Sequence, residues 1–417
     1  MRIGGTRSTL AGGVRRIEAD IAWEDAVRPP SRIFFEISGS LAADASPDAN
    51  AFLAGAAIPA MLAGERRIAI DGEICPRLRD GIAAVEGFFR SWNVRRPPLV
   101  LEPDGGFRPP WPADTPRAAL LLSGGLDSLF TLQENRRRLP IGHPSSFRDA
   151  VRVRHLMFPV DSSPERRAHI EKRSENAVAR IASESTLGVT AVSTNVTHLH
   201  ADFETYMRFS HGSVLACIGL TLAGSATEVT ISASHDLATG LRSWGSHPLL
   251  DPQWSTAAVA IRHEGIAASR LAKAAAIAPW NTALASLYVC ESGPFAGDDV
   301  NCGRCEKCVR TRIDLLLAGG IEFSPTFPRE PVLPSMISGM PGIPGFRILG
   351  YYWRELAAAA RRKGRPDLAA AIEARIEGAD AAREWQADVG WKGALRRVDR
   401  RFFGGILLGA RRRFFGL

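Results

Sequence analysis

The sequence predicts an α/β protein with a doubly wound parallel sheet, an N-terminal α+β domain and a helical C-terminal extension. In residues 116–322, apolar runs of strand length alternate with amphipathic segments, an order typical of parallel strands that are joined by helices. One of these runs ends in Ser-Gly-Gly at residues 123–125 and passes at once into a helical pattern. A glycine-rich turn between a strand and a helix is typical of a site for an anionic ligand.

Residues 1–115 are predicted to form an accessory α+β domain. Strand-like runs occur at residues 32–37, 67–70 and 99–101, and helical patterns occur at residues 50–62 and 78–92. Proline and glycine are frequent between residues 104 and 116, which indicates a linker. The first domain boundary is therefore placed at residue 115.

Residues 116–322 are predicted to form the central doubly wound domain. Strands are expected at residues 118–122, 153–160, 189–194 and 229–234, and helices at 126–138, from 164 onward and at 213–224. Pro140 ends the first of these helices, and Ser163 and Pro164 supply a cap and a first helical residue for the second. This alternation predicts helices that lie on both faces of a parallel sheet.

Residues 323–417 are predicted to form a helical extension that ends in a basic tail. A stretch rich in Pro and Gly at 325–345 precedes helical patterns at 355–361 and 367–375. The tail at 391–417 has eight basic residues and one acidic residue, so it carries a formal charge of +7 and the remainder of the chain carries +1. Its arginines alternate with Phe and Leu, which suits contact with nucleic acid, an anionic membrane surface or a partner helix.

Composition narrows the class of protein. The chain is 45% hydrophobic and 23% charged, which is typical of globular domains. No apolar run approaches the ~18 residues of a membrane span, and the N-terminal residues lack the apolar segment of a secretory signal. We therefore expect a cytoplasmic protein, in which six cysteines indicate metal binding or catalysis rather than a disulfide framework.

The segment Ser-Gly-Gly-Leu-Asp-Ser at residues 123–128 has the properties of a phosphate-binding loop. Gly124 and Gly125 allow close approach of the backbone, and free N–H groups at the start of the following helix attract an anion. Ser123 and Ser128 add hydroxyl groups, whereas Asp127 is interpreted as a Mg²⁺ ligand or a loop-ordering cap. No Gly-Lys-Ser/Thr follows, which excludes a Walker A loop. The alternative is a tight turn with capping residues.

This segment resembles the SGGxDS loop of the ATP pyrophosphatases, which bind the pyrophosphate part of ATP there and cleave between the α- and β-phosphates. The resemblance implies that ATP and Mg²⁺ bind at Ser123, Gly124, Gly125, Leu126, Asp127 and Ser128. Asp161, at the end of the next predicted strand, is expected near the nucleotide.

Four cysteines form a second motif. Cys302, Cys305 and Cys308 are spaced as C-x₂-C-x₂-C and follow Cys290 after eleven residues. Four thiolates complete a tetrahedral zinc site and leave no position open for chemistry, so a structural Zn²⁺ is predicted. An iron–sulfur cluster and a catalytic thiol are the alternatives. Cys75 and Cys217 are interpreted as small core residues.

The glycine loop and the late cysteine cluster together resemble the 7-cyano-7-deazaguanine synthase (QueC) family, in which the zinc is structural. The likeness covers about residues 117–315, half of the chain. The sequence departs from that family at residues 209–212, Phe-Ser-His-Gly, where the family has an Arg-Asn element. It departs again after residue 234, where the family's Tyr-Pro-Asp-Cys-Arg-type stretch is replaced.

The segment 235–251 is predicted to contact the acceptor substrate, because it leaves the carboxyl end of a strand. Arg242 suits a carboxylate, Trp244 offers a stacking face, and Asp236 or Asp251 can accept from ring N–H groups. An ordinary polar surface loop is the alternative. The residues expected to be catalytic are Asp127, Ser128, Arg242 and Asp251.

The resemblance implies an ATP-dependent ligase that adenylates a small-molecule carboxylic acid, such as a 7-deazaguanine carboxylic acid, and releases pyrophosphate. A nitrogen nucleophile then gives a nitrile, an amide or a conjugate with a protein acceptor, as expected for QueC-like relatives in phage defence. Two alternatives stay open. One is a tRNA-modifying enzyme that binds RNA through residues 391–417, and the other is a non-catalytic ATP-binding scaffold.

Overall fold

The computed structural model describes residues 1–109, 115–154, 164–239, 242–290, 300–340 and 346–387. The chain divides into two compact units, residues 1–330 and residues 331–417. Asp161 and the basic tail at 391–417 lie outside the described residues. No helix of the described residues is both long enough and apolar enough to cross a membrane.

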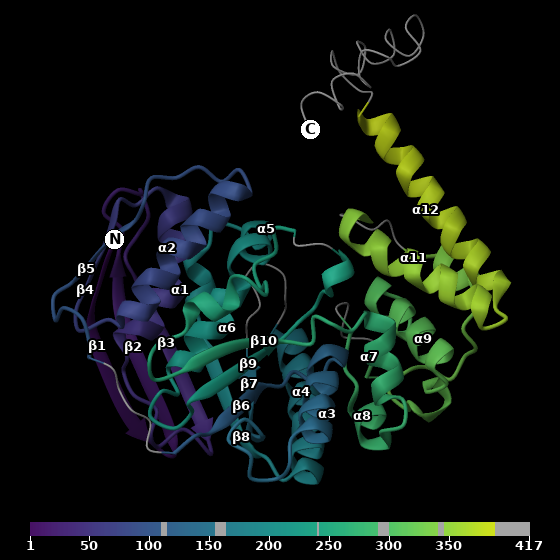
Figure 1. Ribbon diagram of the computed structural model, residues 1–417, viewed down its shortest axis with the longest axis horizontal. Coiled ribbons are helices and arrows are strands. Elements are labelled where there is room, and N and C mark those ends of the chain that lie inside the picture. The colour runs from purple at the N-terminus through teal and green to yellow at the C-terminus, as the bar shows by residue number, and fades with distance from the viewer. Residues whose placement is uncertain (110–114, 155–163, 240–241, 291–299, 341–345, 388–417) are drawn as a thin grey trace, which may run out of the picture. The chain divides into compact units, whose positions relative to one another are not determined.

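The described residues of the first unit form one mixed, mostly parallel sheet of ten strands in the order β10-β9-β6-β7-β8-β3-β2-β1-β4-β5 (Figure 1). The strands are β1 (Arg2–Ala11), β2 (Val14–Ala22), β3 (Ser31–Gly39), β4 (Arg67–Ile70), β5 (Val100–Pro103), β6 (Ala118–Leu121), β7 (Phe147–Arg154), β8 (Gly188–Thr194), β9 (Glu228–Ser232) and β10 (Ala260–Glu264). The five strands from β6 to β10 run parallel to one another. The predicted α/β class, with a largely parallel sheet and helices, is confirmed.

The sheet continues across the boundary that the sequence suggested at residue 115. Strand β3 pairs with β8 in antiparallel orientation, and β2 and β1 follow it. A Cβ atom at Gly39 would lie 2.1 Å from the carbonyl oxygen of Val189, so glycine allows the two strands to approach at this junction. The N-terminal strands therefore extend the central sheet. Strands β1 and β2 were not predicted. Most of β1 is Gly, Ser, Thr and Arg, whereas Ile17, Ala19 and Ile21 of β2 alternate with polar residues as expected for a half-buried strand.

Helices cover both faces of the sheet. Successive residues of a strand face opposite sides, so a strand can contribute apolar residues to two cores. In β6, Ala119 and Leu121 belong to one apolar core, and Ala118 and Leu120 belong to another. The first core includes residues of α1 (Ala49–Ala63), α2 (Pro76–Ser91) and α6 (His211–Leu220). The second includes residues of α3 (Leu126–Arg138), α4 (Pro164–Ser185), α7 (Arg270–Ile277), α8 (Asn281–Ser286) and α9 (Glu306–Ala318) (Figure 1).

Shorter elements complete the first unit. They are α5 (Phe203–Thr205), a π-helix (Tyr206–Ser210) and 3₁₀ helices at Val196–Leu199, Leu237–Thr239, Asp251–Trp254 and Ile321–Phe323. Strand β7 begins at Phe147 and ends at Arg154, whereas the sequence placed a strand at 153–160. The charged residues in β7 interrupt the apolar pattern, and residues 155–160 lie outside the described part of the chain.

The second unit is helical in its described residues. It contains α10 (Pro334–Ser338), α11 (Phe346–Arg362) and α12 (Pro366–Ala387), and the predicted helices at 355–361 and 367–375 lie within the last two. Helices α11 and α12 pack on each other, and Arg361 pairs with Glu373 between them.

Candidate functional site

The glycine loop lies at the topological switch point of the sheet. Strand β6 has β7 on one side and β9 on the other, so the order of strands along the chain reverses at β6. The loop leaves the carboxyl end of β6 at Leu121, and α3 begins at Leu126. In open α/β sheets, ligands bind in the crevice at such a point.

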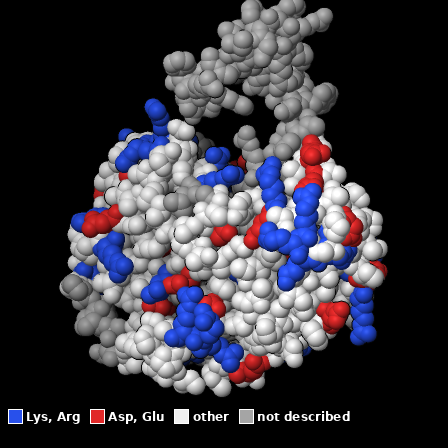
Figure 2. All heavy atoms as spheres, turned by 45° about the vertical axis from the view of Figure 1, so that its right-hand side comes forward, with Lys and Arg blue, Asp and Glu red and all other residues white. Residues whose placement is uncertain are grey.

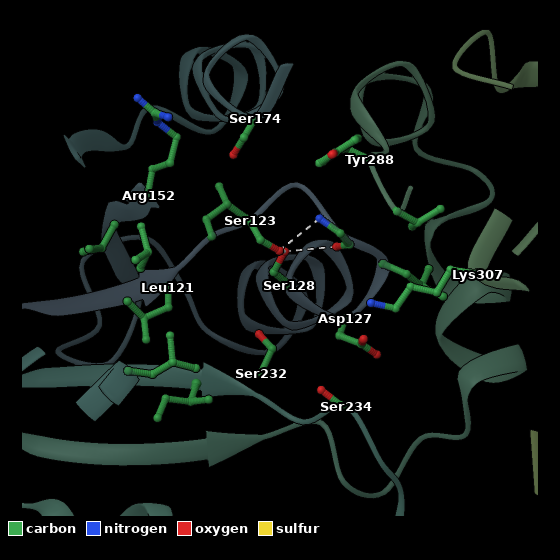
Figure 3. Close-up of a pocket in the computed structure, with 18 of the residues that line it drawn as sticks. Leu121, Ser123, Asp127, Ser128, Arg152, Ser174, Ser232, Ser234, Tyr288 and Lys307 are labelled. Atoms are coloured by element: carbon green, nitrogen blue, oxygen red, sulfur yellow. Dashed lines mark hydrogen bonds between the residues drawn. The ribbon is translucent and has the colours of Figure 1, made fainter. Parts of the chain in front are cut away.

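Internal hydrogen bonds fix the shape of this loop. Gly124 has φ +77°, which favours glycine, and a Cβ atom there would lie 3.1 Å from Cβ of Ala177. The carbonyl oxygen of Gly124 accepts a hydrogen bond of 2.9 Å from the N–H of Tyr288. Oγ of Ser128 donates to the carbonyl oxygen of Gly125 at 3.0 Å, and Oγ of Ser123 accepts from the N–H of Gly125 at 3.2 Å (Figure 3). These hydrogen bonds hold the turn at residues 123–128 in one conformation.

The loop borders a cavity of about 480 Å³. This volume lies within the range of small-molecule sites, about 300–1,000 Å³. Five of the predicted nucleotide-binding residues line the cavity: Ser123, Gly125, Leu126, Asp127 and Ser128. The remaining lining residues come from other elements and include Leu122, Val151, Arg152, Val153, Arg154, Glu171, Ser174, Leu215, Ile231, Ser232, Ser234, Arg270, Tyr288, Val289, Cys290 and Lys307 (Figure 3).

Asp127 forms an ion pair with two cations of α7. Nζ of Lys273 lies 2.9 Å from Oδ1 of Asp127, and the Arg270 guanidinium lies 3.5 Å from Oδ2. The side chain of Lys273 is 2% exposed, whereas that of Asp127 is 24% exposed. Burial acts to raise the pKa of Asp127, but the charges of Lys273 and Arg270 outweigh it and hold the pKa below its ordinary value. Asp127 is therefore an ionised carboxylate in the first turn of α3, directly after the glycine turn.

Sequence reasoning missed Lys273 and Arg270, although a signal was present. Positions 270, 273, 274 and 277 have the spacing of one helix face, and Ala274 and Ile277 are fully buried. Two basic residues at the other two positions of that face must lie inside, where they need a carboxylate. The Arg270 guanidinium also donates to Oγ1 of Thr311 at 2.9 Å and lies 3.3 Å from Oδ2 of Asp314 on α9.

A further cation, Arg152, lies in the wall of the cavity formed by β7 (Figure 3). Its side chain is 5% exposed, and its guanidinium lies 4.0 Å from Glu171 and 3.9 Å from Glu175. Burial lowers the pKa of Arg152, while the two distant carboxylates act in the opposite direction. Arg154 pairs more closely with Glu171. The sequence did not single out Arg152, because the strand was placed later in the chain.

Arg242 and Asp251, both expected to be catalytic, are not among the described residues that line this cavity. Asp251 is completely buried, and it accepts from Oγ of Ser246 at 2.6 Å and lies 2.7 Å from Nδ1 of His263. It therefore anchors the segment after β9 to β10. Arg242 is exposed.

The other polar residues of the segment 235–251 also have internal contacts. The Trp244 ring is half-buried, and its centroid lies 5.2 Å from that of His211 and 5.1 Å from that of His235. Burial lowers the pKa of both histidines to about 4, so they are neutral at pH 7. Asp236 accepts from the N–H of Thr239 at 2.9 Å.

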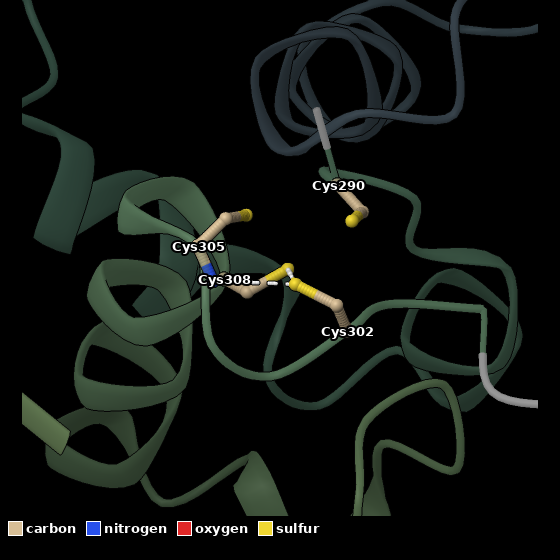
Figure 4. A group of neighbouring side chains, drawn as sticks. All are labelled: Cys290, Cys302, Cys305 and Cys308. Atoms are coloured by element: carbon tan, nitrogen blue, oxygen red, sulfur yellow. Dashed lines mark hydrogen bonds between the residues drawn. The ribbon is translucent and has the colours of Figure 1, made fainter. Parts of the chain in front are cut away.

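The four cysteines of the second motif converge. Their sulfur atoms all lie within 4.8 Å of one another, and those of Cys302 and Cys308 are 3.7 Å apart (Figure 4). Tetrahedral zinc with Zn–S bonds of ~2.3 Å places its sulfurs about 3.8 Å apart, so this set can hold a metal ion such as zinc. The N–H groups of Arg304 and Cys305 lie 3.4 and 3.2 Å from Sγ of Cys302, as suits a thiolate.

The remaining cysteines lie away from this cluster. Cys75 and Cys217 are buried in the first core. Burial raises the pKa of the Cys217 thiol above its usual range, and the thiol donates to the carbonyl oxygen of Val214 at 3.1 Å. Both fit the predicted role of small core residues.

Comparison of the chain with protein-family models, with curated proteins and with solved structures finds no match.

Proposed function

We propose that the cavity binds ATP and that the protein transfers the adenylyl group of ATP to a carboxylate, with release of pyrophosphate. The observation that supports this most strongly is the position of the turn at residues 123–128. The turn lies at the switch point of the sheet and borders a cavity whose lining includes Arg152, Arg270 and Lys307. Helix α3 begins at this turn, so its free N–H groups favour an anion at that place.

The β- and γ-phosphates bind at the turn. The backbone N–H groups at the start of α3 and the hydroxyl groups of Ser123 and Ser128 donate to the phosphate oxygens. Asp127 holds Lys273 and Arg270 beside the turn through the ion pairs described above. Mg²⁺, when bound, neutralises phosphate charge as pyrophosphate leaves, and the partly exposed carboxylate of Asp127 is the group of the turn that can bind it.

The base and the acid occupy the rest of the cavity. Leu122, Val151, Val153, Leu215 and Ile231 give apolar surface that suits a flat purine ring. Arg152 takes the place that the sequence suggested for Arg242, because it is a buried cation in the β7 wall of the cavity and can orient a substrate carboxylate.

The reaction has two steps. An oxygen of the carboxylate attacks the α-phosphorus, the bond between that phosphorus and the oxygen bridging to the β-phosphorus breaks, and pyrophosphate leaves. A nitrogen nucleophile then attacks the carbonyl carbon of the acyl-adenylate, and AMP leaves. The protein contributes by holding the acid and the nucleotide in line, which can supply roughly 7–11 kcal/mol at best. A 7-deazaguanine carboxylic acid is the expected substrate, and ammonia or a protein amine is the expected nucleophile.

The test is an assay of products. The protein is incubated with MgATP and 7-carboxy-7-deazaguanine, with and without ammonium, and AMP, pyrophosphate and the product mass are followed. We expect AMP and pyrophosphate in equal amounts, and their loss in Asp127→Asn. Asp80→Asn is the matched control, because Asp80 is an exposed aspartate of α2. Formation of ADP, or no formation of AMP, would overturn the proposal.

A further inference from the structure

The segments that carry the four cysteines also form one wall of the proposed ATP cavity. Tyr288, Val289 and Cys290 line the cavity, and so does Lys307. The N–H of Tyr288 donates a hydrogen bond to the carbonyl oxygen of Gly124 in the glycine loop. The buried Asn301 holds this wall together, because its Oδ1 accepts from the N–H groups of Val289 and Cys290 at 2.9 and 3.1 Å.

Lys307 stands between two of the metal-ligating cysteines, Cys305 and Cys308. It lies in the first turn of α9, is half-buried, and extends toward the side of the cavity where Asp127 lies (Figure 3). A cation is unfavourable in the first turn of a helix because the helix dipole is positive there. An anion bound beside Lys307 removes this penalty.

Two cations of α7 also lie beside the glycine loop, and both contact carboxylates. Lys273 and Arg270 share Asp127, and Arg270 also contacts Asp314. A pyrophosphate group carries more negative charge than these partly neutralised cations can balance. On the face of the protein drawn in Figure 2, many Lys and Arg side chains lie beside Asp or Glu side chains. Lys307 adds a further cation to the lining of the cavity, and this suits a polyphosphate ligand.

We propose that residues 302–308, here called the cysteine knuckle, are a phosphate-binding element of this cavity. Lys307 binds the β- and γ-phosphates and then the pyrophosphate product, and a metal ion on Cys290, Cys302, Cys305 and Cys308 fixes the backbone on both sides of Lys307. This inference rests on the proposed function, but it assigns the cysteine cluster a role in ligand binding as well as in folding.

Two consequences follow. The loss of one charge-assisted contact to a phosphate should weaken binding of magnesium pyrophosphate about 10- to 100-fold. Because coupling between two sites is reciprocal, bound pyrophosphate should also slow the loss of metal from the cysteines.

The experiment compares two single variants of the cysteine knuckle in the metal-loaded, full-length protein. One replaces a lysine and the other replaces an arginine. Lys307→Met removes the cation that lines the cavity, and Arg304→Met removes an exposed cation of the same knuckle that is not among the described lining residues. Binding of magnesium pyrophosphate and of MgATP is measured by calorimetry. We expect weaker binding of both ligands in Lys307→Met and unchanged binding in Arg304→Met. Equal affinity in Lys307→Met and wild type overturns the inference and leaves the proposed function standing. Failure of the wild type to bind either ligand overturns both.

A second measurement does not depend on a variant. Transfer of the metal to a coloured chelator is timed for the wild type with and without magnesium pyrophosphate. We expect transfer to slow severalfold when pyrophosphate is bound, and this protection to be reduced in Lys307→Met. Identical transfer times with and without pyrophosphate would show that the metal and the phosphate site are not coupled.

Discussion

The ion pair between Asp127 and Lys273 predicts an asymmetric response to mutation. Asp127→Asn leaves the ammonium of Lys273, which is 2% exposed, without its carboxylate. Removal of one partner of a buried pair typically costs about 3–5 kcal/mol. Asp127 is 24% exposed and Arg270 keeps its contact with Asp314, so we expect the free energy of unfolding to fall by about 2–3 kcal/mol.

The opposite change should cost less. Lys273→Met keeps most of the side-chain volume beside Phe130, and the carboxylate of Asp127 can be hydrated from the cavity. The carbonyl oxygen of Ala233 loses its donor, so we expect a loss of about 1 kcal/mol. The double variant Asp127→Asn/Lys273→Met should also lose only about 1 kcal/mol, because the uncompensated buried charge is gone.

Urea denaturation of the wild type and the three variants measures these values, with the slope m checked for constancy. The coupling free energy should be about 2–3 kcal/mol. The same titrations repeated below pH 5 supply a second check. The pKa of Asp127 is lower in the folded protein, so the stabilisation is fully present above the unfolded-state pKa of about 4 and is lost as the pH falls through the folded-state pKa. Additive losses at pH 7 would refute the ion pair.

Four further outcomes are expected. Gly124→Ala should lose about 1–2 kcal/mol of stability and most nucleotide binding, because φ is +77° there, and calorimetry with MgATP checks it. Asp251→Asn should lower the unfolding midpoint in urea but leave the affinity for MgATP unchanged, and a loss of affinity would place Asp251 in the site. Cys308→Ser should abolish stoichiometric zinc binding in metal analysis of the purified protein. The pKa of buried His211 is lowered to about 4, so the unfolded chain binds more protons between pH 6.5 and 4; the free energy of unfolding should fall as the pH decreases through this window, by up to about 2 kcal/mol at pH 5, and less in His211→Gln.

The parts of the candidate site that could be predicted from the sequence are local in the chain. Residues 123–128 and the cysteines at 302–308 owe their chemistry to spacing within one turn, so the order of residue types is enough to indicate the loop and the metal site. The prediction that the four cysteines can hold a metal agrees with the arrangement of their sulfur atoms.

The parts that were missed depend on contacts between distant segments. Lys273 lies 146 residues from Asp127 along the chain, and nothing local in α7 indicates its partner. Asp251 was expected to face a substrate because it follows a strand, but His263 and Ser246 occupy its oxygens in the interior. The continuation of the sheet through β3 and β8 likewise depends on pairing of strands about 150 residues apart, which no periodicity within either strand specifies.

A crystal structure with α,β-methylene-ATP and magnesium tests the proposed nucleotide site most directly. We expect the β- and γ-phosphates to lie against the backbone N–H groups of residues 123–128, with the ammonium group of Lys307 within hydrogen-bonding distance of a phosphate oxygen. A nucleotide bound elsewhere, with the turn at residues 123–128 filled by the protein's own side chains, would contradict it.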